Sequence, residues 1–104
     1  MSEPMYYVLA TLLDGPLHGH AIIKGVAETS RGRVKPSVGT LYGLLDRLAA
    51  NGVIVVDREE TVNGRKRRYF RITDSGEALV RAEAERMHEA ASVIRGRALG
   101  ASFA

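Results

Sequence analysis

The segment that most constrains the fold is residues 36–73, where a helical pattern is followed directly by two strand patterns. The helical pattern ends at Asn51-Gly52, a pair typical of helix C-termini, and a β-branched run follows. Asn63-Gly64 predicts a tight hairpin turn, and four consecutive cations, residues 65–68, lie beside it. A helix followed by a basic hairpin is typical of a winged helix, in which the helix suits a DNA major groove and the cationic ribbon suits phosphates or a minor groove.

Two further helical patterns precede this segment and complete a three-helix body. Apolar residues recur at helical spacing over residues 4–13 and 18–30, and Asp14-Gly15-Pro16 breaks the pattern between them. Ser37 is positioned to cap the third helix. The buried stripe of that helix is predicted to be Val38, Leu41, Leu45 and Leu48, with Leu44 beside it.

The second strand is predicted over residues 67–72, with Phe70 and Ile72 facing the helices. A last helix is predicted to begin at Thr73 or Asp74, with Glu77 and Asp74 forming a capping box. Its heptad residues are Val80, Ala84, Met87, Ala91 and Ile94. Because this helix is apolar on more than one side, we expect it to pack on a second subunit.

The predicted fold class is therefore mainly α with a small β-hairpin, a winged helix-turn-helix plus one C-terminal dimerisation helix. Residues 1–73 are expected to form the DNA-binding domain, and residues 74–104 the dimerisation helix and a frayed tail. A chain of 104 residues can bury one small core but is too short for a typical enzyme with a deep cleft.

Composition narrows the possible partners. The net charge of +3 arises within residues 37–73, which hold seven cations and four anions. The chain has no cysteine, which excludes disulfides and thiolate metal sites. It has neither a basic leader nor an apolar run that could span a bilayer, so we expect a cytoplasmic protein with no membrane partner.

The predicted partner is double-stranded DNA, contacted by polar and cationic side chains that lie off the buried stripe or on the wing. The predicted contacts are Lys35, Ser37, Thr40, Tyr42, Arg47, Arg65, Lys66, Arg67 and Arg68. Strand alternation puts Arg68 on the same side as Phe70, which indicates a structural role for Arg68 and favours Arg65 and Arg67 as phosphate contacts.

Three alternatives are open on the sequence alone. Tyr42 can be half-buried, with Arg47 paired to Asp46. The wing can be a solvated turn balanced by the acidic side chains of the paired strand, which are Asp57, Glu59 and Glu60. The domain can also be a winged-helix module that binds a protein instead of DNA, and an apolar patch should then be exposed on the third helix.

Three motifs carry a family resemblance. Residues 14–19 read DGPLHG, residues 39–42 read GTLY and are followed by Arg47-Leu48, and residues 64–73 read GRKRRYFRIT. These stretches resemble the first loop, the recognition helix and the wing of the PadR family of bacterial transcriptional regulators. His20 stands where the family usually has tyrosine, and Gly43 where proline is common.

The resemblance implies a homodimeric winged-helix repressor of the short branch, which has a single C-terminal helix and binds a near-palindromic operator. That helix would pack against the first helix of the partner, with Val8, Leu9 and Leu12 as the dimerisation residues there. Some relatives hold flat aromatic compounds between their C-terminal helices by means of tryptophan. This chain has no tryptophan, so that binding mode is not carried over.

A small-molecule effector that releases the repressor is a further expectation. A pocket between the two final helices, near Met87, Ala91 and Ile94, is the hypothesis for its site, and its identity is not encoded in the pattern. No cofactor is expected. The three histidines, which are His18, His20 and His88, give only a weak metal signal. Because no nucleophile, base and orienting group recur together, an enzyme is not expected either.

Overall fold

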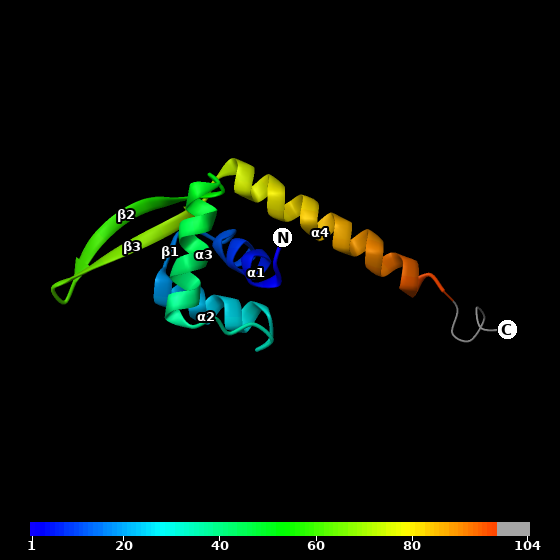
Figure 1. Ribbon diagram of the computed structural model, residues 1–104, viewed down its shortest axis with the longest axis horizontal. Helices are drawn as coiled ribbons and strands as arrows, with labels where there is room; N and C mark the ends of the chain where they lie inside the picture. Colours follow the sequence, from blue (N-terminus) through cyan, green and yellow to red (C-terminus); the bar gives the residue numbers. More distant parts are fainter. Residues whose placement is uncertain (98–104) are drawn as a thin grey trace.

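The computed structural model describes residues 1–97, and the expected frayed tail over residues 98–104 lies outside this range. The elements are α1 (Glu3–Leu12), β1 (Leu17–His18), α2 (Gly19–Thr29), α3 (Val38–Ala50), β2 (Ile54–Val62), β3 (Arg65–Ile72) and α4 (Asp74–Arg95). The first three helices form the body, from which the β2–β3 hairpin projects on one side and α4 on the other (Figure 1). The predicted class, mainly helical with a small hairpin, is confirmed.

Hydroxyl side chains cap the N-termini of three helices, which are α1, α3 and α4. The Oγ of Ser2 accepts a hydrogen bond from Met5 N, that of Ser37 from Thr40 N, and the Oγ1 of Thr73 from Gly76 N. The predicted capping of α3 by Ser37 is therefore confirmed.

The predicted capping box between Asp74 and Glu77 is wrong. Thr73 is the N-cap of α4, so the third helical position is Gly76, which has no side chain to complete a box. Glu77 instead accepts from Arg81 one turn later, with 2.9 Å between Oε1 and Nη2. An exposed pair of this kind contributes little to stability.

The sheet has three antiparallel strands in the order β1-β3-β2, although the sequence pattern indicated only two. In β1, Leu17 pairs with Phe70 and His18 with Tyr69. A strand of two residues is too short to give a periodic signal, which is why it was missed. The predicted tight turn is confirmed, because Asn63 and Gly64 both have positive φ, 52° and 77°, as a type I′ turn requires.

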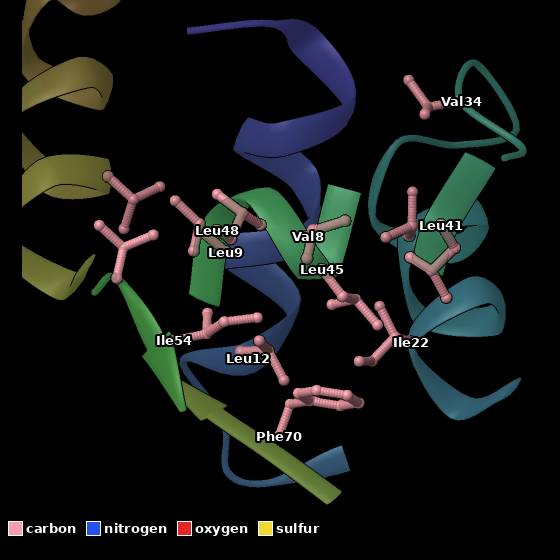
Figure 2. Close-up of a cluster of buried hydrophobic side chains, with 13 residues drawn as sticks. Val8, Leu9, Leu12, Ile22, Val34, Leu41, Leu45, Leu48, Ile54 and Phe70 are labelled. Atoms are coloured by element: carbon pink, nitrogen blue, oxygen red, sulfur yellow. The ribbon is translucent and has the colours of Figure 1, made fainter. Parts of the chain in front are cut away.

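One core joins the helices to the base of the hairpin. Phe70 points from β3 toward the helices, where Leu12 and Ile22 belong to the same buried cluster (Figure 2). On α3, the buried side chains are Leu41, Leu44, Leu45 and Leu48. Val38 does not belong to the stripe as predicted, since 49% of it is exposed. It is the first residue of α3, where the helix extends past the core.

The apolar stripe of α1 faces the core of its own protomer. Val8 and Leu9 are 0% exposed and Leu12 is 1% exposed, because α1 lies between α2, α4 and β3. Val80 on α4 belongs to the same core, with 3% exposed. These four residues therefore cannot present a surface to a second subunit, which corrects their assignment as dimerisation residues.

Beyond its first turns, α4 is an exposed helix. Of its 22 residues, Gly76 and Val80 are buried. The large apolar side chains left exposed on it are Leu79, Met87, Val93 and Ile94. Within residues 1–97, no helix combines the length and the apolar character that crossing a membrane would need.

The corrected stripe of α3 gives a prediction about stability. Leu41→Ala should lower the free energy of unfolding by about 2–5 kcal/mol, because Leu41 is fully buried and its truncation leaves a cavity. Val38→Ala, on the same helix but half exposed, should change it by less than about 0.5 kcal/mol. Urea unfolding followed by circular dichroism measures both values. Equal losses from the two variants would contradict the assignment of the stripe.

Candidate nucleic-acid interface

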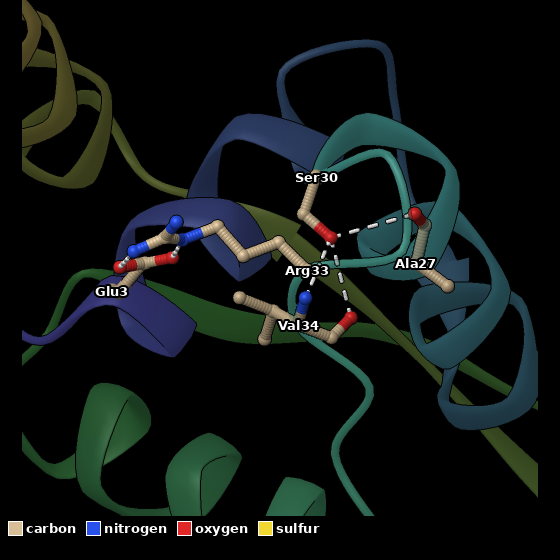
Figure 3. Close-up of polar contacts among 5 residues, drawn as sticks. All are labelled: Glu3, Ala27, Ser30, Arg33 and Val34. Atoms are coloured by element: carbon tan, nitrogen blue, oxygen red, sulfur yellow. Dashed lines mark hydrogen bonds and ion pairs between the residues drawn. The ribbon is translucent and has the colours of Figure 1, made fainter.

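The loop that leads into α3 is fixed at two points. The Oγ of buried Ser30 accepts a hydrogen bond from Val34 N at 2.9 Å, and it lies 3.3 Å from the carbonyl oxygen of Val34 and 3.4 Å from that of Ala27 (Figure 3). Arg33 forms an ion pair with Glu3 at the start of α1. The loop is thereby tied both to the end of α2 and to α1, and this sets the direction in which α3 begins.

The predicted contacts on α3 and just before it are exposed, except for Tyr42. Lys35, Ser37, Thr40 and Arg47 all lie at the surface. The hydroxyl of Ser37 donates to the Oγ1 of Thr40 at 3.0 Å while capping the helix, so Thr40 keeps its own hydroxyl proton for an outside acceptor. The first turn of α3 carries no acidic residue, so its positive end is not neutralised. Arg47 takes part in no ion pair within the described residues, and the alternative pairing with Asp46 is not observed.

Tyr42 is half-buried against the core, as the more conservative alternative held, and its ring also lines the groove described below. Its hydroxyl lies over Gly19 at the start of α2, where an added Cβ would come within 2.5 Å of the phenol oxygen. The Tyr42 ring of α3 thus lies close against the first residue of α2.

The wing carries two paired acids on β2 and a group of cations at the start of β3. Asp57 pairs with Arg58 at 3.2 Å and with Arg71 at 3.6 Å, and Glu60, which lies opposite Arg67 in the strand register, pairs with Arg58 at 2.8 Å. Hydrogen bonding to Arg58 lowers the pKa of Glu60, so this acid stays ionised. At the tip, no ion pair within residues 1–97 involves the four cations, which are Arg65, Lys66, Arg67 and Arg68. Of the acids on β2, Asp57 and Glu60 pair with Arg58 or Arg71, and Glu59 forms no ion pair within the described residues. The tip therefore keeps its positive charge.

Arg68 has a position between the two roles considered for it. Its guanidinium lies 5.7 Å from the centre of the Phe70 ring, on the side of β3 that faces the helices. Its side chain is nevertheless exposed, because the hairpin at this point has passed beyond the core. A contact with Phe70 and a contact with an outside anion are therefore compatible.

An open groove of about 890 Å³ separates the wing from the start of α2 and from α3. All four tip cations line it, and so does Tyr42 from the recognition helix. The other lining residues are His18, Gly19, His20, Glu59, Val62 and Asn63. The groove thus brings together one wall of unpaired positive charge and one wall of helix and histidine side chains, as a polyanion site requires.

His18 belongs to an aromatic row across the outer face of the sheet. Its ring stacks on Tyr69 of β3, with 5.5 Å between the ring centroids. Arg58, which pairs with Tyr69 from the other neighbouring strand, β2, places its guanidinium 3.9 Å from the centre of the Tyr69 ring. Desolvation lowers the pKa of His18, and the nearby charge of Arg67 lowers it further. The buried Nδ1 has no hydrogen-bond partner within the described residues, which also disfavours a second ring proton. Desolvation and the charge of Arg67 thus disfavour the protonated form of His18.

A second cleft, of about 640 Å³, lies between α1 and α4. It is lined by Met1, Ser2, Glu3, Tyr6, Tyr7, Arg33, Glu83, Arg86 and Met87. Of the three residues predicted to surround an effector, Met87 lines this cleft, whereas Ala91 and Ile94 lie further along the exposed part of α4. For residues 1–97, no group of three or more potential ligand side chains is arranged to hold a metal ion.

Three residues that shape the interface were not among the predicted sites. Ser30 and Gly19 act through close contacts between segments far apart in the chain, and no local pattern signals such contacts. The sequence gives His18 only a weak metal signal, and the family resemblance makes it a loop residue that packs or caps; its pairing with Tyr69 depends on the short strand β1 and has no sequence signal.

The chain is similar to a known protein family and to individual relatives. Residues 8–82 match the model of the transcriptional regulator PadR-like family. The transcriptional regulator Rv3488 of Mycobacterium tuberculosis is 33% identical over 90 residues, which are 86% of this chain and 80% of that protein. An uncharacterized 37.1 kDa protein in transposon TN4556 of Streptomyces fradiae is 41% identical over 86 residues, 83% of this chain. The match spans only 23% of that longer protein.

Among solved structures, Bacillus subtilis PadR in complex with operator DNA superimposes with a TM-score of 0.69 at 22% identity. The match covers 77% of this chain and 45% of that one. At this level of identity, the likeness shows a shared fold.

The environment of His18 predicts how stability depends on pH. Because folding lowers the pKa of His18 from its ordinary value of 6.5, the unfolded chain binds a proton at higher pH than the folded one. Stability should therefore fall as the pH is lowered from 7 to 5. His18→Gln should reduce this loss, measured as the change in Tm between the two pH values. The acids with lowered pKa, Glu60 and Glu83, also begin to lose stabilisation as the pH approaches 4.5, but both proteins retain them, so they do not affect the difference between wild type and variant. An equal loss of Tm in the variant would contradict the assignment.

Proposed function

The chain belongs to the PadR-like family of transcriptional regulators, and we propose that it is a homodimeric repressor that binds a near-palindromic operator in double-stranded DNA. The observation that carries the proposal is the groove in which four unpaired wing cations face the recognition helix. Like charges held together at a hairpin tip repel one another, so a polyanion is the ligand that would relieve them.

In this proposal α3 enters the major groove and the wing contacts the flanking backbone or the minor groove. Thr40 and Arg47 would donate to phosphates or base edges from the exposed side of α3, and Lys35 and Ser37 would contact the backbone at its start. Tyr42, whose ring lies beside Gly19, would reach the backbone from the groove. On the wing, Arg65 and Arg67 are the preferred phosphate contacts, with Lys66 and Arg68 beside them.

We place the dimer interface on the exposed part of α4. Ala84, Met87, Ala91 and Ile94 keep the heptad spacing there and are all solvent-exposed in the protomer. The partner surface on α1 cannot be its buried stripe, so we assign it to residues that line the second cleft, Met1 and Tyr6 among them. A twofold axis through such an interface would place the two α3 helices about 10 bp apart or a multiple of that.

A small-molecule effector would fit this scheme if it bound in the cleft between α1 and α4. Met87, a flexible and polarisable side chain, lines that cleft at the edge of the proposed interface. A ligand there would change how α4 packs and release the operator. The competing proposal of a protein-binding module has less support, because Val38 is the one large apolar side chain exposed on α3, a helix that is described throughout.

The wing contacts predict the salt dependence of DNA binding. Titration of duplex DNA from the promoter of its own gene should give a salt-sensitive complex, with about 0.9 added to the log–log slope for each phosphate neutralised. The double variant Arg65→Ala, Arg67→Ala should lower that slope by about 1.8. Arg71→Ala is the matched control on the same strand, because Asp57 engages this guanidinium, and it should leave the slope unchanged. If the double variant kept the wild-type slope, the assignment of the wing to the DNA interface would be wrong.

The proposed seam predicts the effect of a charge on α4. Ile94→Asp should weaken dimerisation about 100-fold, because burying an unpaired carboxylate in each subunit is costly, and operator affinity should fall with it. Ser92→Asp adds the same charge two residues away, off the heptad seam, and should leave the dimer intact. Sedimentation equilibrium measures the dissociation constants. Unchanged dimerisation of the Ile94 variant would place the interface elsewhere.

A further inference from the structure

The end of α3 and the start of α4 meet at a joint made almost entirely of backbone and small side chains. After α3, Gly52 adopts a left-handed conformation with φ of 73°. Gly52 N donates to the carbonyl of Ala49 at 3.0 Å, and Val53 N donates to that of Leu48 at 3.1 Å. These two bonds form a Schellman motif, so the carbonyl group of Gly52 is held in a fixed direction by the recognition helix.

Two hydroxyl groups from the start of α4 converge on that carbonyl. The Oγ1 of Thr73 donates to Gly52 O at 2.8 Å, and the Oγ of Ser75 donates to the same oxygen at 3.1 Å. The backbone N–H of Thr73 donates to the carbonyl of Val53 at 3.0 Å. Three hydrogen bonds therefore link two consecutive residues after α3 to the first turn of α4.

Gly76 allows this close approach. It is buried, and a Cβ at this position would collide with the carbonyl oxygen of Val53 and lie 2.8 Å from the Cγ1 of Ile72. Since the first obstacle is backbone, it could be avoided only by moving α4 away from α3. Glycine at this position thus allows the present separation of the two helices. From this point, beside the end of α3, α4 leads away from the body (Figure 1).

A small change at this joint would be amplified at the far end of α4. Of the helix, only Gly76 and Val80 are buried, and within the described residues the part beyond Met87 lines neither the core nor the cleft with α1. From Gly76 to Arg95 the helix extends about 29 Å, at about 1.5 Å per residue. A tilt of about 5° at the joint would move the far end by about 2.5 Å, which is a substantial fraction of one base-pair step.

We propose that the α3–α4 joint, made of Gly52, Val53, Thr73, Ser75 and Gly76, sets the angle between the recognition helix and α4 and thereby the half-site separation that the dimer reads. Thr73, Ser75 and Gly76 are positioning residues in this scheme and do not touch DNA. The inference rests on the proposed function, in which α4 forms the dimer and α3 enters the groove.

The angle can be measured without DNA and without reference to the dimer. Because the chain has no cysteine, Asp46→Cys on α3 and Glu85→Cys on α4 give two unique sites for spin labels, both exposed. Labelled protein diluted into unlabelled protein reports the α3–α4 distance within single chains by double electron–electron resonance. The width of the distance distribution measures how firmly the joint holds.

The decisive variant removes both hydroxyl donors and keeps the helix cap. In Thr73→Asp, Ser75→Ala, aspartate can still accept from Gly76 N but cannot donate to Gly52 O. The distance distribution should broaden, while helix content stays that of the wild type. Thr73→Ser retains both the cap and the donor, and it should leave the distribution unchanged. If the double variant fails to fold, Ser75→Ala alone, which leaves the cap untouched, should broaden the distribution to a smaller extent.

The functional readout uses unlabelled protein and synthetic duplexes. The half-site is first recovered by selection from a random-sequence pool. Each duplex then carries two inverted copies of it, separated by a spacer that is lengthened one base pair at a time. The wild type should prefer one spacing. The ratio of its affinity for that spacing to its affinity for a spacing two base pairs longer should be about ten times smaller in the double variant. A mere loss of stability would lower affinity for all spacings equally and leave this ratio unchanged.

An unchanged distance distribution in the double variant would overturn the proposal. An unchanged spacing ratio in a variant whose distribution has broadened would overturn it as well. If the wild type binds none of the duplexes with salt sensitivity, the proposed function fails, and the label distances still decide whether the joint fixes α4.

Discussion

The burial of Phe70 at the base of the hairpin is the interaction on which the interface depends. Phe70 is 4% exposed and pairs with Leu17 on one neighbouring strand and with Val56 on the other. A shift of one residue in the register of β3 would bring Tyr69 or Arg71 to the core face and expose Phe70, so the register is strongly determined. Ile54 of β2 is buried in the same core, so the hairpin is anchored at its base, while its outer half lies beyond the core and is free to carry charge.

Charge along the hairpin follows from that division. On β2, the two acids Asp57 and Glu60 are engaged by arginines of the same sheet, and these exposed pairs add little to stability. Further out, repulsion among the tip cations opposes folding only weakly, because water and salt screen exposed charges. The fold can therefore hold a concentrated positive potential next to α3 at small energetic cost, and this potential would attract DNA before any specific contact forms.

Much of this arrangement could be predicted from the sequence, because its signals are local. The cap at Ser37, the turn at Asn63-Gly64 and the inward direction of Phe70 each depend on a few consecutive residues. The failures have a common physical cause. An apolar periodicity reveals that a face of a helix is buried but not what buries it, so the stripe containing Leu9 was assigned to a partner when it serves the protomer.

The same reason applies to the contacts that hold the site in place. Tyr42 over Gly19 and the Ser30 bonds join segments whose proximity arises only when the whole core has formed. The strand β1, with two residues, exists because β3 offers it an edge, and no intrinsic preference of Leu17 or His18 reveals it. Tertiary context, not propensity, decides these elements.

The position of α1 explains how events at α4 could reach the DNA-binding surface over a short path. Its buried stripe packs in the same cluster as Leu45 of α3 and Val80 of α4, so the three helices share one core. A change in the packing of α4 therefore has two routes to α3, one through this close-packed core and one through the hydrogen bonds on Gly52. Because a close-packed core resists deformation and the joint ties the start of α4 to the residues that follow α3, a shift of α4 would carry α3 with it before it disturbed the packing around Leu45. In the proposed dimer, the surface that would meet the partner and the surface that would meet DNA can thus be coupled with the core left intact.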